Sequence, residues 1–380
     1  MTTLGLPRAS AEEKERLVHD FVRLCEIESP SRRERGVADA VAAELRALDL
    51  ELGEDDSGAW TGSDAGNLLA RVPGPRGAAT ILLCAHLDTV PVAAPIEVVI
   101  HDSGVIENRN DAILGADNKA AVAALIAIAR RLVREPARVG VELLFTTCEE
   151  AALAGARAFD VGALEARHGY VFDHASPIGE LIVAAPTYLR LEASFRGHAA
   201  HAGIRPEQGR SAIVAAAALI SALRLGRLDD ETTANVGRIE GGTAVNVVAE
   251  RCRVELEARS LDQDKATALA GEMIDAAAQA ASDSGCDVET SLEEQFRGYR
   301  LARSSPPVVV AAAALEGLGI EPRYVATGGG SDASALQARG LACVNIANGT
   351  EANHEPDERV TVAALETMLD VMLAIVALSG

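Results

Sequence analysis

Short, mostly apolar runs alternate with helical segments in the first half of the chain, and this alternation restricts the fold more than any other feature. The runs lie at residues 80–85 (TILLCA), 139–147 and 170–172. A strand with no polar face is expected inside a sheet that helices cover on both sides. Strands joined by helical crossovers lie parallel to one another. The sequence therefore predicts an α/β fold with a mixed, mostly parallel sheet and helices on both faces.

The pattern changes near residue 186. Residues 188–195 (YLRLEASF) alternate strictly between apolar and polar side chains, which is typical of a sheet with one wet face. The elements expected from there to residue 293 follow the order β-α-β-β-α-β of the ferredoxin-like unit. Beyond residue 299 the first pattern returns. We therefore expect an α/β domain built from residues 1–185 and 299–380, interrupted by a small α+β domain at residues 186–298.

Composition excludes several classes of function. The chain of 380 residues has 35 Lys and Arg against 56 Asp and Glu, a formal charge of −21, and only 3% of its residues are aromatic. Such a surface repels nucleic acid. The sequence shows no apolar run of the roughly 18 residues that a membrane span needs, and its start does not resemble a signal peptide. Six scattered cysteines without a C-x-x-C pair fit a reduced protein, so we expect a cytoplasmic location.

His86 and Asp88 directly follow the apolar run at residues 80–85. The carboxyl ends of parallel strands meet at one edge of a sheet, where α/β proteins place their sites. An imidazole there can bind a metal through one ring nitrogen, while a carboxylate two residues on takes the proton of the other nitrogen. A buried histidine hydrogen-bonded to a buried aspartate would explain the same pair without a metal.

Three more acidic residues lie where a helix is expected to begin or a strand to end. Asp117 precedes the helix expected from Ala120, and aspartate ordinarily caps a helix there. Glu149 and Glu150 follow the strand expected at residues 139–147. Burying two adjacent carboxylates is costly unless a cation or a proton compensates. The glutamate pair therefore either binds a cation or forms the solvated start of a helix.

Two later strands bring ligands to the same edge. Asp173 follows residues 170–172, and His354 follows the strand expected at residues 342–346. His174 would point to the opposite face if its strand continues, so we leave it out. Four strand ends that each carry an imidazole or a carboxylate are not readily placed on one edge by chance. We interpret them as one site.

The candidate donors are two imidazoles, three carboxylates and a spare glutamate. Nitrogen and oxygen ligands suit zinc, manganese or cobalt rather than an iron–sulfur cluster. Five ligands exceed the three of one open catalytic zinc site, and they suit two cations that share a bridging carboxylate. Two ions about 3.5–4 Å apart can acidify a common water and hold both oxygens of a tetrahedral intermediate. The spare glutamate can then act as general base.

These motifs in combination resemble those of the M20 family of metallopeptidases. HLDTVP, ADNKA, CEE, FDH and NHEP occur in the family's order and spacing, and GHAAHAG lies in the insertion. Within the family the chain is most similar to the peptidase T-like (tripeptide aminopeptidase) branch, through segments such as ETTANVGRIEGG and GGGSDAS. The resemblance covers essentially the whole chain. It implies a zinc-peptidase-like catalytic domain interrupted by a lid and dimerisation domain.

The resemblance also implies how the metal ligands are shared. His86 and Asp173 would hold one zinc ion, while Glu150 and His354 would hold the other. Asp117 would bridge the two ions, and the peptide bond that follows it would be cis. Zn2+ is the expected metal, with Mn2+ or Co2+ as alternatives.

Five other residues take their expected roles from the same resemblance. Asp88 would orient the first imidazole, and Glu149 would take a proton from the water that attacks the scissile carbonyl. His201 in the lid would contact the developing oxyanion, from its own subunit or across a dimer. Asn246 and Arg259 would hold terminal or side-chain groups of the substrate. His198 competes with His201, which we prefer because its HAG tripeptide matches the family.

We therefore expect a di-zinc aminopeptidase that cleaves small peptides and forms a homodimer through its lid. Asp173 stands where carboxypeptidase-like and deacylating relatives usually carry glutamate, which favours the aminopeptidase. An N-acyl amino acid amidohydrolase or a carboxypeptidase with the same metal chemistry is the nearest alternative. A non-catalytic metal-binding dimeric protein is the alternative from another class.

Overall fold

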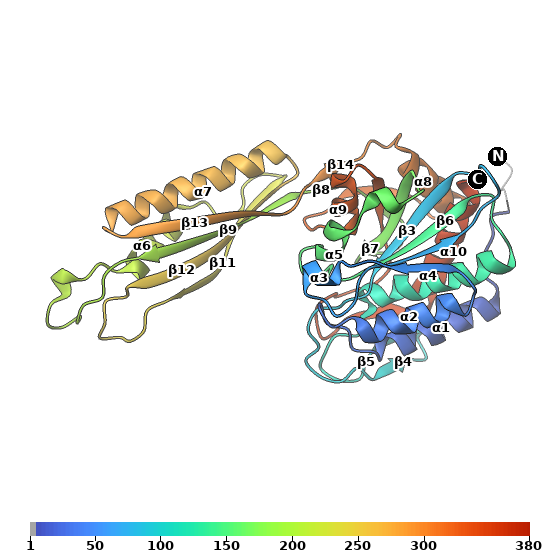
Figure 1. Ribbon diagram of the computed structural model, residues 1–380, viewed down its shortest axis with the longest axis horizontal. Helices are drawn as coiled ribbons and strands as arrows, with labels where there is room; N and C mark the ends of the chain where they lie inside the picture. The colour runs from blue at the N-terminus through green and yellow to red at the C-terminus, as the bar shows by residue number, and fades with distance from the viewer. Residues whose placement is uncertain (1–4) are drawn as a thin grey trace. The chain divides into compact units, whose positions relative to one another are not determined.

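The computed structural model describes residues 5–380, which form two compact units (Figure 1). Unit 1 consists of the chain up to Ala184 together with Arg300–Gly380, and unit 2 is Ala185–Tyr299. None of the helices within residues 5–380 has both the length and the apolar character that crossing a bilayer requires.

A nine-stranded sheet forms the centre of unit 1. Its strand order is β1-β2-β6-β3-β7-β16-β8-β14, and β15 pairs with β8. The strands are β1 (Glu51–Glu54), β2 (Leu68–Val72), β3 (Thr80–His86), β6 (Gly140–Thr146), β7 (His168–His174), β8 (Glu180–Ala185), β14 (Tyr299–Arg300), β15 (Arg323–Ala326) and β16 (Ala342–Ala347). The four central strands β6, β3, β7 and β16 are parallel, while β1, β2 and β6 pair antiparallel. The predicted mixed, mostly parallel sheet is confirmed.

Helices cover both faces of this sheet. The longer ones are α1 (Ala11–Cys25), α2 (Arg35–Arg46), α4 (Ala116–Arg134), α8 (Pro306–Gly317) and α10 (Val362–Leu378), and the short ones are α3 (Gly58–Thr61), α5 (Ala154–Ala158) and α9 (Asp332–Ala338). Ile81, Leu83 and Ala85 of β3 are buried in the core that includes α4. On the other face, the Cys84 thiol contacts the Asp332 carboxylate of α9 at 3.9 Å. Burial on both sides explains why this strand is apolar throughout.

A second, three-stranded sheet in unit 1 was not expected from the sequence. It consists of β4 (Val98–Ile100), β5 (Val105–Asn108) and β17 (Arg359–Thr361), in the order β17-β5-β4. These strands have only three or four residues, most of which are half-buried or exposed. They therefore lack the apolar runs from which the central sheet is predicted. Strand β17 matters for the site because the segment that precedes it carries His354.

Unit 2 has the ferredoxin-like order that the sequence predicts. Its strands are β9 (Thr187–Arg196), β10 (Gly226–Arg227), β11 (Thr232–Gly241), β12 (Arg251–Ser260) and β13 (Asp287–Phe296), and its helices are α6 (Ala212–Ala222) and α7 (Gln263–Asp283). The sheet is antiparallel in the order β10-β11-β12-β9-β13. Alternate residues such as Leu191 and Val254 pack with Leu219 of α6 and Met273 of α7 in a core of their own.

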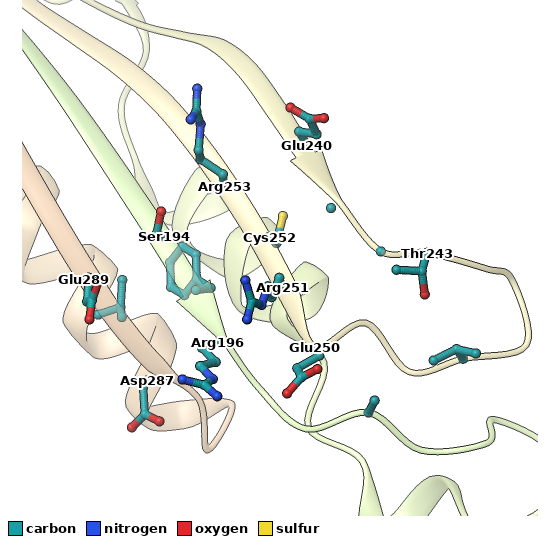
Figure 2. Close-up of a pocket in the computed structure, with 16 residues that line it drawn as sticks. Ser194, Arg196, Glu240, Thr243, Glu250, Arg251, Cys252, Arg253, Asp287 and Glu289 are labelled. Atoms are coloured by element: carbon teal, nitrogen blue, oxygen red, sulfur yellow. The ribbon is translucent and has the colours of Figure 1, made fainter.

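The opposite face of the unit 2 sheet carries the charged half of each alternating strand. A hollow of about 1060 Å³ lies where β9 ends and β12 begins, and residues from both faces of the sheet line it (Figure 2). Arg196, Arg251 and Arg253 line it together with acidic side chains such as Glu240 and Glu250. Charges of both signs meet there, so the lining by itself favours neither an anionic nor a cationic ligand.

Candidate metal centre

Parallel strands bring two predicted ligands side by side. His86 is the last residue of β3, and Asp173 lies near the end of the neighbouring parallel strand β7. His86 Nε2 lies 3.5 Å from Asp173 Oδ1. The imidazole is only 1% exposed, so its ring nitrogens interact with neighbouring protein groups and hardly at all with solvent. The carboxyl edge of the sheet therefore supplies the first two donors.

Asp117 lies between two groups of donors, because each of its oxygens faces a different imidazole. Its Oδ1 is 3.1 Å from His86 Nε2, and its Oδ2 is 3.4 Å from His354 Nε2. Asn353 Nδ2 also donates to Oδ2 at 2.8 Å. The residue stands at the start of α4 with non-helical dihedral angles, and the Asp117–Asn118 peptide bond is cis, as the family resemblance implies.

His354 and Glu150 complete the second group. His354 Nε2 lies 2.8 Å from Glu150 Oε1. The histidine comes from the segment between β16 and β17, has a φ of +68°, and keeps about half of its side chain exposed. Glu150 belongs to the turn that follows β6, beside Glu149. The five predicted metal ligands therefore meet at one place, although they come from five separate segments.

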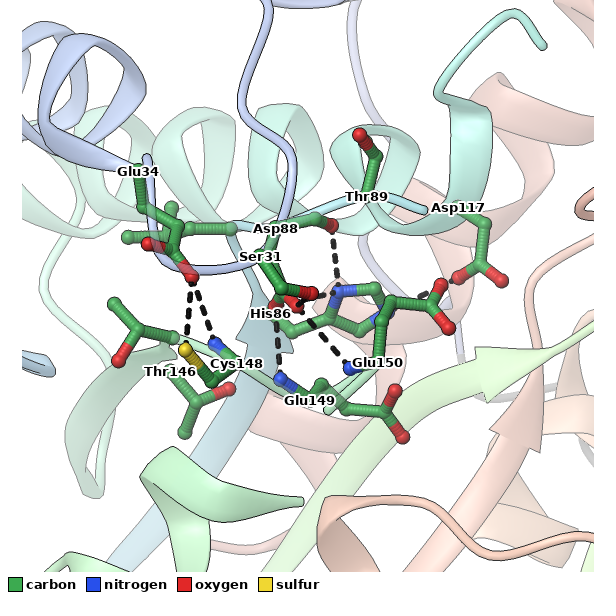
Figure 3. A network of polar contacts seen from close by, with 12 residues as sticks. Ser31, Glu34, His86, Asp88, Thr89, Asp117, Thr146, Cys148, Glu149 and Glu150 are labelled. Atoms are coloured by element: carbon green, nitrogen blue, oxygen red, sulfur yellow. Dashed lines mark hydrogen bonds and ion pairs between the residues drawn. The ribbon is translucent and has the colours of Figure 1, made fainter. Parts of the chain in front are cut away.

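Glu149 also reaches this cluster (Figure 3). One donor atom from each of His86, Glu149 and Asp173 lies within 4.8 Å of the other two, and the same holds for His86, Asp117 and Glu150. These two triads share an imidazole and are otherwise distinct. The side chain that the sequence assigns to proton transfer thus stands within reach of the ligands.

The cluster holds more negative charge than its imidazoles can balance. Burial, and next the charge of Asp173, raise the pKa of Glu149 well above the usual range. Burial, and next the charge of Asp117, do the same to the pKa of Asp173. Hydrogen bonds to Asp117 and Glu150 raise the pKa of His354 to about 10. The pKa shifts of Glu149 and Asp173 show that further negative charge is disfavoured in this buried cluster, and the pKa shift of His354 shows that neighbouring carboxylates stabilise a positive charge beside them. The nitrogen and carboxylate donors suit Zn2+, Mn2+ or Co2+. These residues fit bound divalent cations.

Buried side chains fix the backbone of the ligand-bearing segments. Glu358 accepts hydrogen bonds from the amides of Gly115 at 2.7 Å and Asp117 at 2.9 Å. Asn345 of β16 accepts from the amide of Asp173 and donates to its carbonyl, both at 3.0 Å. Burial raises the pKa of Glu358 to about 7. Ligands held through their own main chain have little freedom to move, which preorganises the site.

Asp88 acts on two segments at once. Its backbone carbonyl accepts the Nδ1–H of His86 at 2.9 Å, whereas its carboxylate Oδ1 lies 3.5 Å from that nitrogen. The carboxylate instead accepts the amides of Glu149 and Glu150 at 2.9 and 3.1 Å and the Ser31 hydroxyl at 2.6 Å. A carbonyl can only accept, so Nδ1 carries the proton and Nε2 is left for a metal. The orienting contact expected of the Asp88 side chain is thus made mainly by its main chain.

Asn345 and Glu358 were not expected from the sequence to take part in the site. Asn345 interrupts the apolar run of β16, and a polar residue inside a buried strand is a signal that can be read. Glu358 stands in the acidic segment HEPDE, four residues after His354, and nothing in that segment distinguishes it from its exposed neighbours Glu355 and Asp357. Only the fold shows that it is buried.

Comparisons with known proteins show which proteins this chain resembles along most of its length. The crystal structure of aminopeptidase PepT from Bacillus cereus is 36% identical, covers 96% of this chain and 98% of that chain, and has a TM-score of 0.88. A tripeptidase structure from Staphylococcus aureus is 30% identical over 96% of this chain and 98% of that chain, with a TM-score of 0.91. Peptidase T of Serratia proteamaculans is 26% identical over 76% of this chain and 71% of its own length.

This chain belongs to the M20 family of metallopeptidases. Residues 184–284, nearly all of unit 2, match the model of the peptidase dimerisation domain. Residues 67–169, which run from β2 to the start of β7, match the model of peptidase family M28. Full-length similarity to the aminopeptidase and the tripeptidase places the protein in the peptidase T-like branch. It is therefore a metal-dependent peptidase.

In this M20 peptidase, two of the residues predicted for the lid lie together in unit 2. His201 and Asn246 stand on adjoining loops, since His201 forms a β-bridge with Val247, the neighbour of Asn246. Both loops lie where β9 ends and β12 begins, close to the paired residues Arg196 and Arg251. Thr243 and Val247 of the Asn246 loop also line the hollow in Figure 2.

Arg259 lies near the opposite end of β12. Its guanidinium is 4.0 Å from the centre of the Tyr188 ring and 3.1 Å from the Glu257 carboxylate. Eight residues separate it from Arg251, and a strand rises about 3.3 Å per residue, so the two ends are roughly 26 Å apart. Unit 2 of one subunit therefore does not bring Arg259 and His201 to the same small peptide.

The metal centre predicts a large effect of cations on stability. A divalent cation that binds only the folded cluster should raise the free energy of unfolding by about 2.7 kcal/mol at a hundredfold excess over its dissociation constant. Differential scanning calorimetry of chelator-treated protein with added Zn2+ or Mn2+ measures the shift. The Asp117→Ala variant should lose most of it, whereas Asp39→Ala, at an exposed surface carboxylate, should keep it. An equal shift in both variants would show that the cations bind elsewhere.

Proposed function

We propose that this M20 peptidase is a two-metal aminopeptidase that releases the N-terminal residue of tripeptides. One observation carries the proposal. The two oxygens of Asp117 face separate imidazoles, those of His86 and His354, at 3.1 and 3.4 Å, and each imidazole has a further carboxylate beside it. A carboxylate that is shared in this way is what a pair of neighbouring cations requires.

The proposed ligands follow from this sharing. His86 and Asp173 would hold one cation, Glu150 and His354 the other, and Asp117 both. We propose Zn2+ as the metal because nitrogen and carboxylate donors suit it, with Mn2+ or Co2+ able to replace it. When bound, such ions supply a water of lowered pKa and polarise the scissile carbonyl.

Glu149 is the proposed general base. Its amide is fixed by Asp88, and burial together with the charge of Asp173 raises the pKa of its carboxyl group. A carboxylate with a raised pKa takes a proton more readily, and it can return that proton to the leaving amine. Glu149 would therefore remove the proton from the attacking water and deliver it to the amine nitrogen.

The substrate class rests on the relatives and on Arg259. The structures most similar to this chain are named as an aminopeptidase and a tripeptidase. Arg259 stacks on Tyr188 on the open face of the unit 2 sheet, and a guanidinium held in this way can pair with a substrate carboxylate. We propose that Arg259 binds the C-terminal carboxylate of a tripeptide and that Asn246 binds another polar group of the substrate.

Unit 2 has a surface suited to a second copy of the chain. On the outer side of α6, Val214 is 60% exposed and Ile213 is 41% exposed, beside the exposed residues Ala217 and Ala218. Ile239 of β11 is 49% exposed, and β10 pairs only with the beginning of β11. An apolar helix face beside an unpaired strand edge is typical of a twofold interface in which two sheets join. The match to the dimerisation domain supports a homodimer formed through unit 2.

A homodimer also resolves the separation between Arg259 and His201. Because the two residues lie at opposite ends of β12, we propose that each active site takes them from different subunits. Arg259 would serve the site of its own subunit, and His201 would contact the developing oxyanion in the site of the partner.

The compartment is part of the proposal as well. All six cysteines are free, and five of them are buried. Free thiols are typical of proteins kept in a reducing environment, so we propose that the enzyme works in the cytoplasm.

A small peptide panel tests the proposed activity. Tri-alanine with a free amine should be cleaved to alanine and dialanine, and the same peptide with an acetylated amine should be cleaved at least about a hundredfold more slowly, because an aminopeptidase recognises the charged amine. Liquid chromatography of the products measures both rates. Preferred cleavage of the acetylated peptide would instead support the amidohydrolase or the carboxypeptidase.

The Glu149→Gln variant is the control for this panel. It keeps the size of the side chain and the metal ligands but removes the base, so kcat should fall by about 10² to 10⁴. Metal content and circular dichroism should match the unaltered enzyme. Turnover close to that of the unaltered enzyme would contradict the role of Glu149.

A mixed dimer tests whether His201 acts across subunits. Co-expression of Glu149→Gln and His201→Ala chains with different tags allows the heterodimer to be isolated. Its Glu149-containing site would receive His201 from the partner, so it should regain about half of the unaltered kcat per dimer, since one of two sites is complete.

The two parent homodimers and a heterodimer of Glu149→Gln with the unaltered chain are the matched controls. Both parents should be nearly inactive, and the control heterodimer should have about half the activity. If His201 serves its own subunit, the mixed dimer contains no complete site and should be as inactive as its parents.

A further inference from the structure

The turn that carries Glu149 and Glu150 is held by side chains from three other segments. Four consecutive backbone amides each donate to a side-chain oxygen. The pairs are Thr147 to Asn67 at 3.0 Å, Cys148 to Glu34 at 3.0 Å, Glu149 to Asp88 at 2.9 Å and Glu150 to Asp88 at 3.1 Å. Each of these successive amides is thus bound by a side chain, and the segment includes both glutamates of the candidate site.

Glu34 is the least expected member of this set. It precedes α2, is fully buried, and belongs to none of the motifs that the sequence analysis singled out. Its Oε1 accepts the amide and the thiol of Cys148 at 3.0 and 3.2 Å and the amide of Arg32 at 2.9 Å, while its Oε2 accepts the Ser63 hydroxyl at 2.5 Å. Figure 3 shows the carboxylate facing Cys148. A buried carboxylate with this many donors is held in one orientation.

The backbone at Cys148 needs such support. Its φ is +52°, in the left-handed region that residues other than glycine rarely adopt. A backbone conformation of this kind persists where its surroundings determine it. Cys148 stands between the end of β6 and the two glutamates, so its conformation sets the direction in which the chain continues to Glu149.

We propose that Glu34 is a positioning residue for the peptidase reaction. By holding the Cys148 amide and thiol, it fixes the turn so that the carboxylate of Glu149 stands at the reacting water. The inference rests on the proposed role of Glu149 as general base. A displacement of about 1 Å at a reacting group can cost about a hundredfold in rate, so an anchor one residue away affects turnover directly.

Removing the anchor should lower turnover rather than substrate binding. In Glu34→Ala, assayed with tri-alanine at saturating metal, kcat should fall by about 10- to 100-fold while KM changes by less than about threefold. Glu34→Gln should recover kcat to within about threefold, because its carbonyl can accept the Cys148 amide and its NH2 can donate to the Ser63 hydroxyl.

Glu142 provides a matched control. It lies near the other end of β6, is 1% exposed, and accepts the amides of Glu165 and Ala166 at about 3 Å. Its carboxylate also pairs with the Arg71 guanidinium at 3.1 Å. Glu142→Ala therefore removes a buried acceptor of main-chain amides at the end of β6 away from the metal centre. It should lower the melting temperature about as much as Glu34→Ala does but leave kcat within about twofold. A purely structural role for Glu34 predicts that the two variants behave alike in kcat, and that result would overturn the proposal.

Two further variants settle the remaining outcomes. If Glu34→Ala does not fold, Glu34→Asp keeps the charge but falls short of the Cys148 amide by one methylene group, and unaltered kcat in that variant would also overturn the proposal.

In the Glu149→Gln background, Glu34→Ala should lower the residual kcat by less than about threefold, because both changes act through one group. A full additional loss would mean that Glu34 does not act through Glu149. If Glu149→Gln alone retains full activity, the proposed function fails first, and the two failures remain distinct.

Discussion

Carboxylates outnumber imidazoles at the edge where β3, β6 and β7 end, so the fold has to hold an excess of negative charge there. Burying several carboxylates together is unfavourable unless cations or protons compensate. Burial and then the charge of a neighbouring carboxylate raise the pKa of Glu149 and of Asp173, whereas hydrogen bonds to Asp117 and Glu150 raise the pKa of His354. In a metal-dependent peptidase, the folded chain holds such carboxylates together against their mutual repulsion. The binding of cations then relieves that repulsion.

Main-chain hydrogen bonds supply much of that restraint. Asn345 holds Asp173, Glu358 holds Asp117, and Asp88 holds both glutamates of the turn after β6. Each contact binds the main chain of a candidate ligand and not its side chain. The side-chain oxygens therefore remain available to a metal ion. The same logic assigns Glu34 its place in the network. Parallel strands set the ligands roughly at one edge, and buried acceptors then fix their final positions.

Sequence patterns predict the sheet, and they predict candidate ligands that the fold brings to one edge of it, because both depend on local chemistry. Residues 80–85 are apolar throughout since both faces of β3 are covered, and His86 follows at the strand end as a candidate ligand. The start of α4 is less predictable. A helix is expected from Ala120, and the observed element begins at Ala116 with non-helical angles at Asp117, whose amide donates to the distant carboxylate of Glu358. The segment GGGSDAS gives no helical signal, yet α9 begins within it at Asp332.

Other residues could not be found from the sequence because their roles arise from distant contacts. Glu34 lies in the polar segment SRRE and resembles a surface residue, but the chain places it against Cys148, 114 positions away. Glu358 is hidden in the same manner. The separation of Arg259 from His201 likewise becomes visible only once β9 and β12 are paired along their full length. Local sequence patterns indicate which residues are buried and which secondary structure they form. They do not indicate which distant side chain accepts a hydrogen bond, or which residues lie at opposite ends of a sheet, because both depend on the topology of the fold.

Anomalous diffraction at the zinc absorption edge, from crystals of the zinc-loaded enzyme, shows whether Asp117 lies between two cations, as we propose. We expect two peaks about 3.5–4 Å apart, both adjacent to Asp117, one beside His86 and Asp173 and the other beside Glu150 and His354. A single peak, or peaks remote from Asp117, would contradict this proposal.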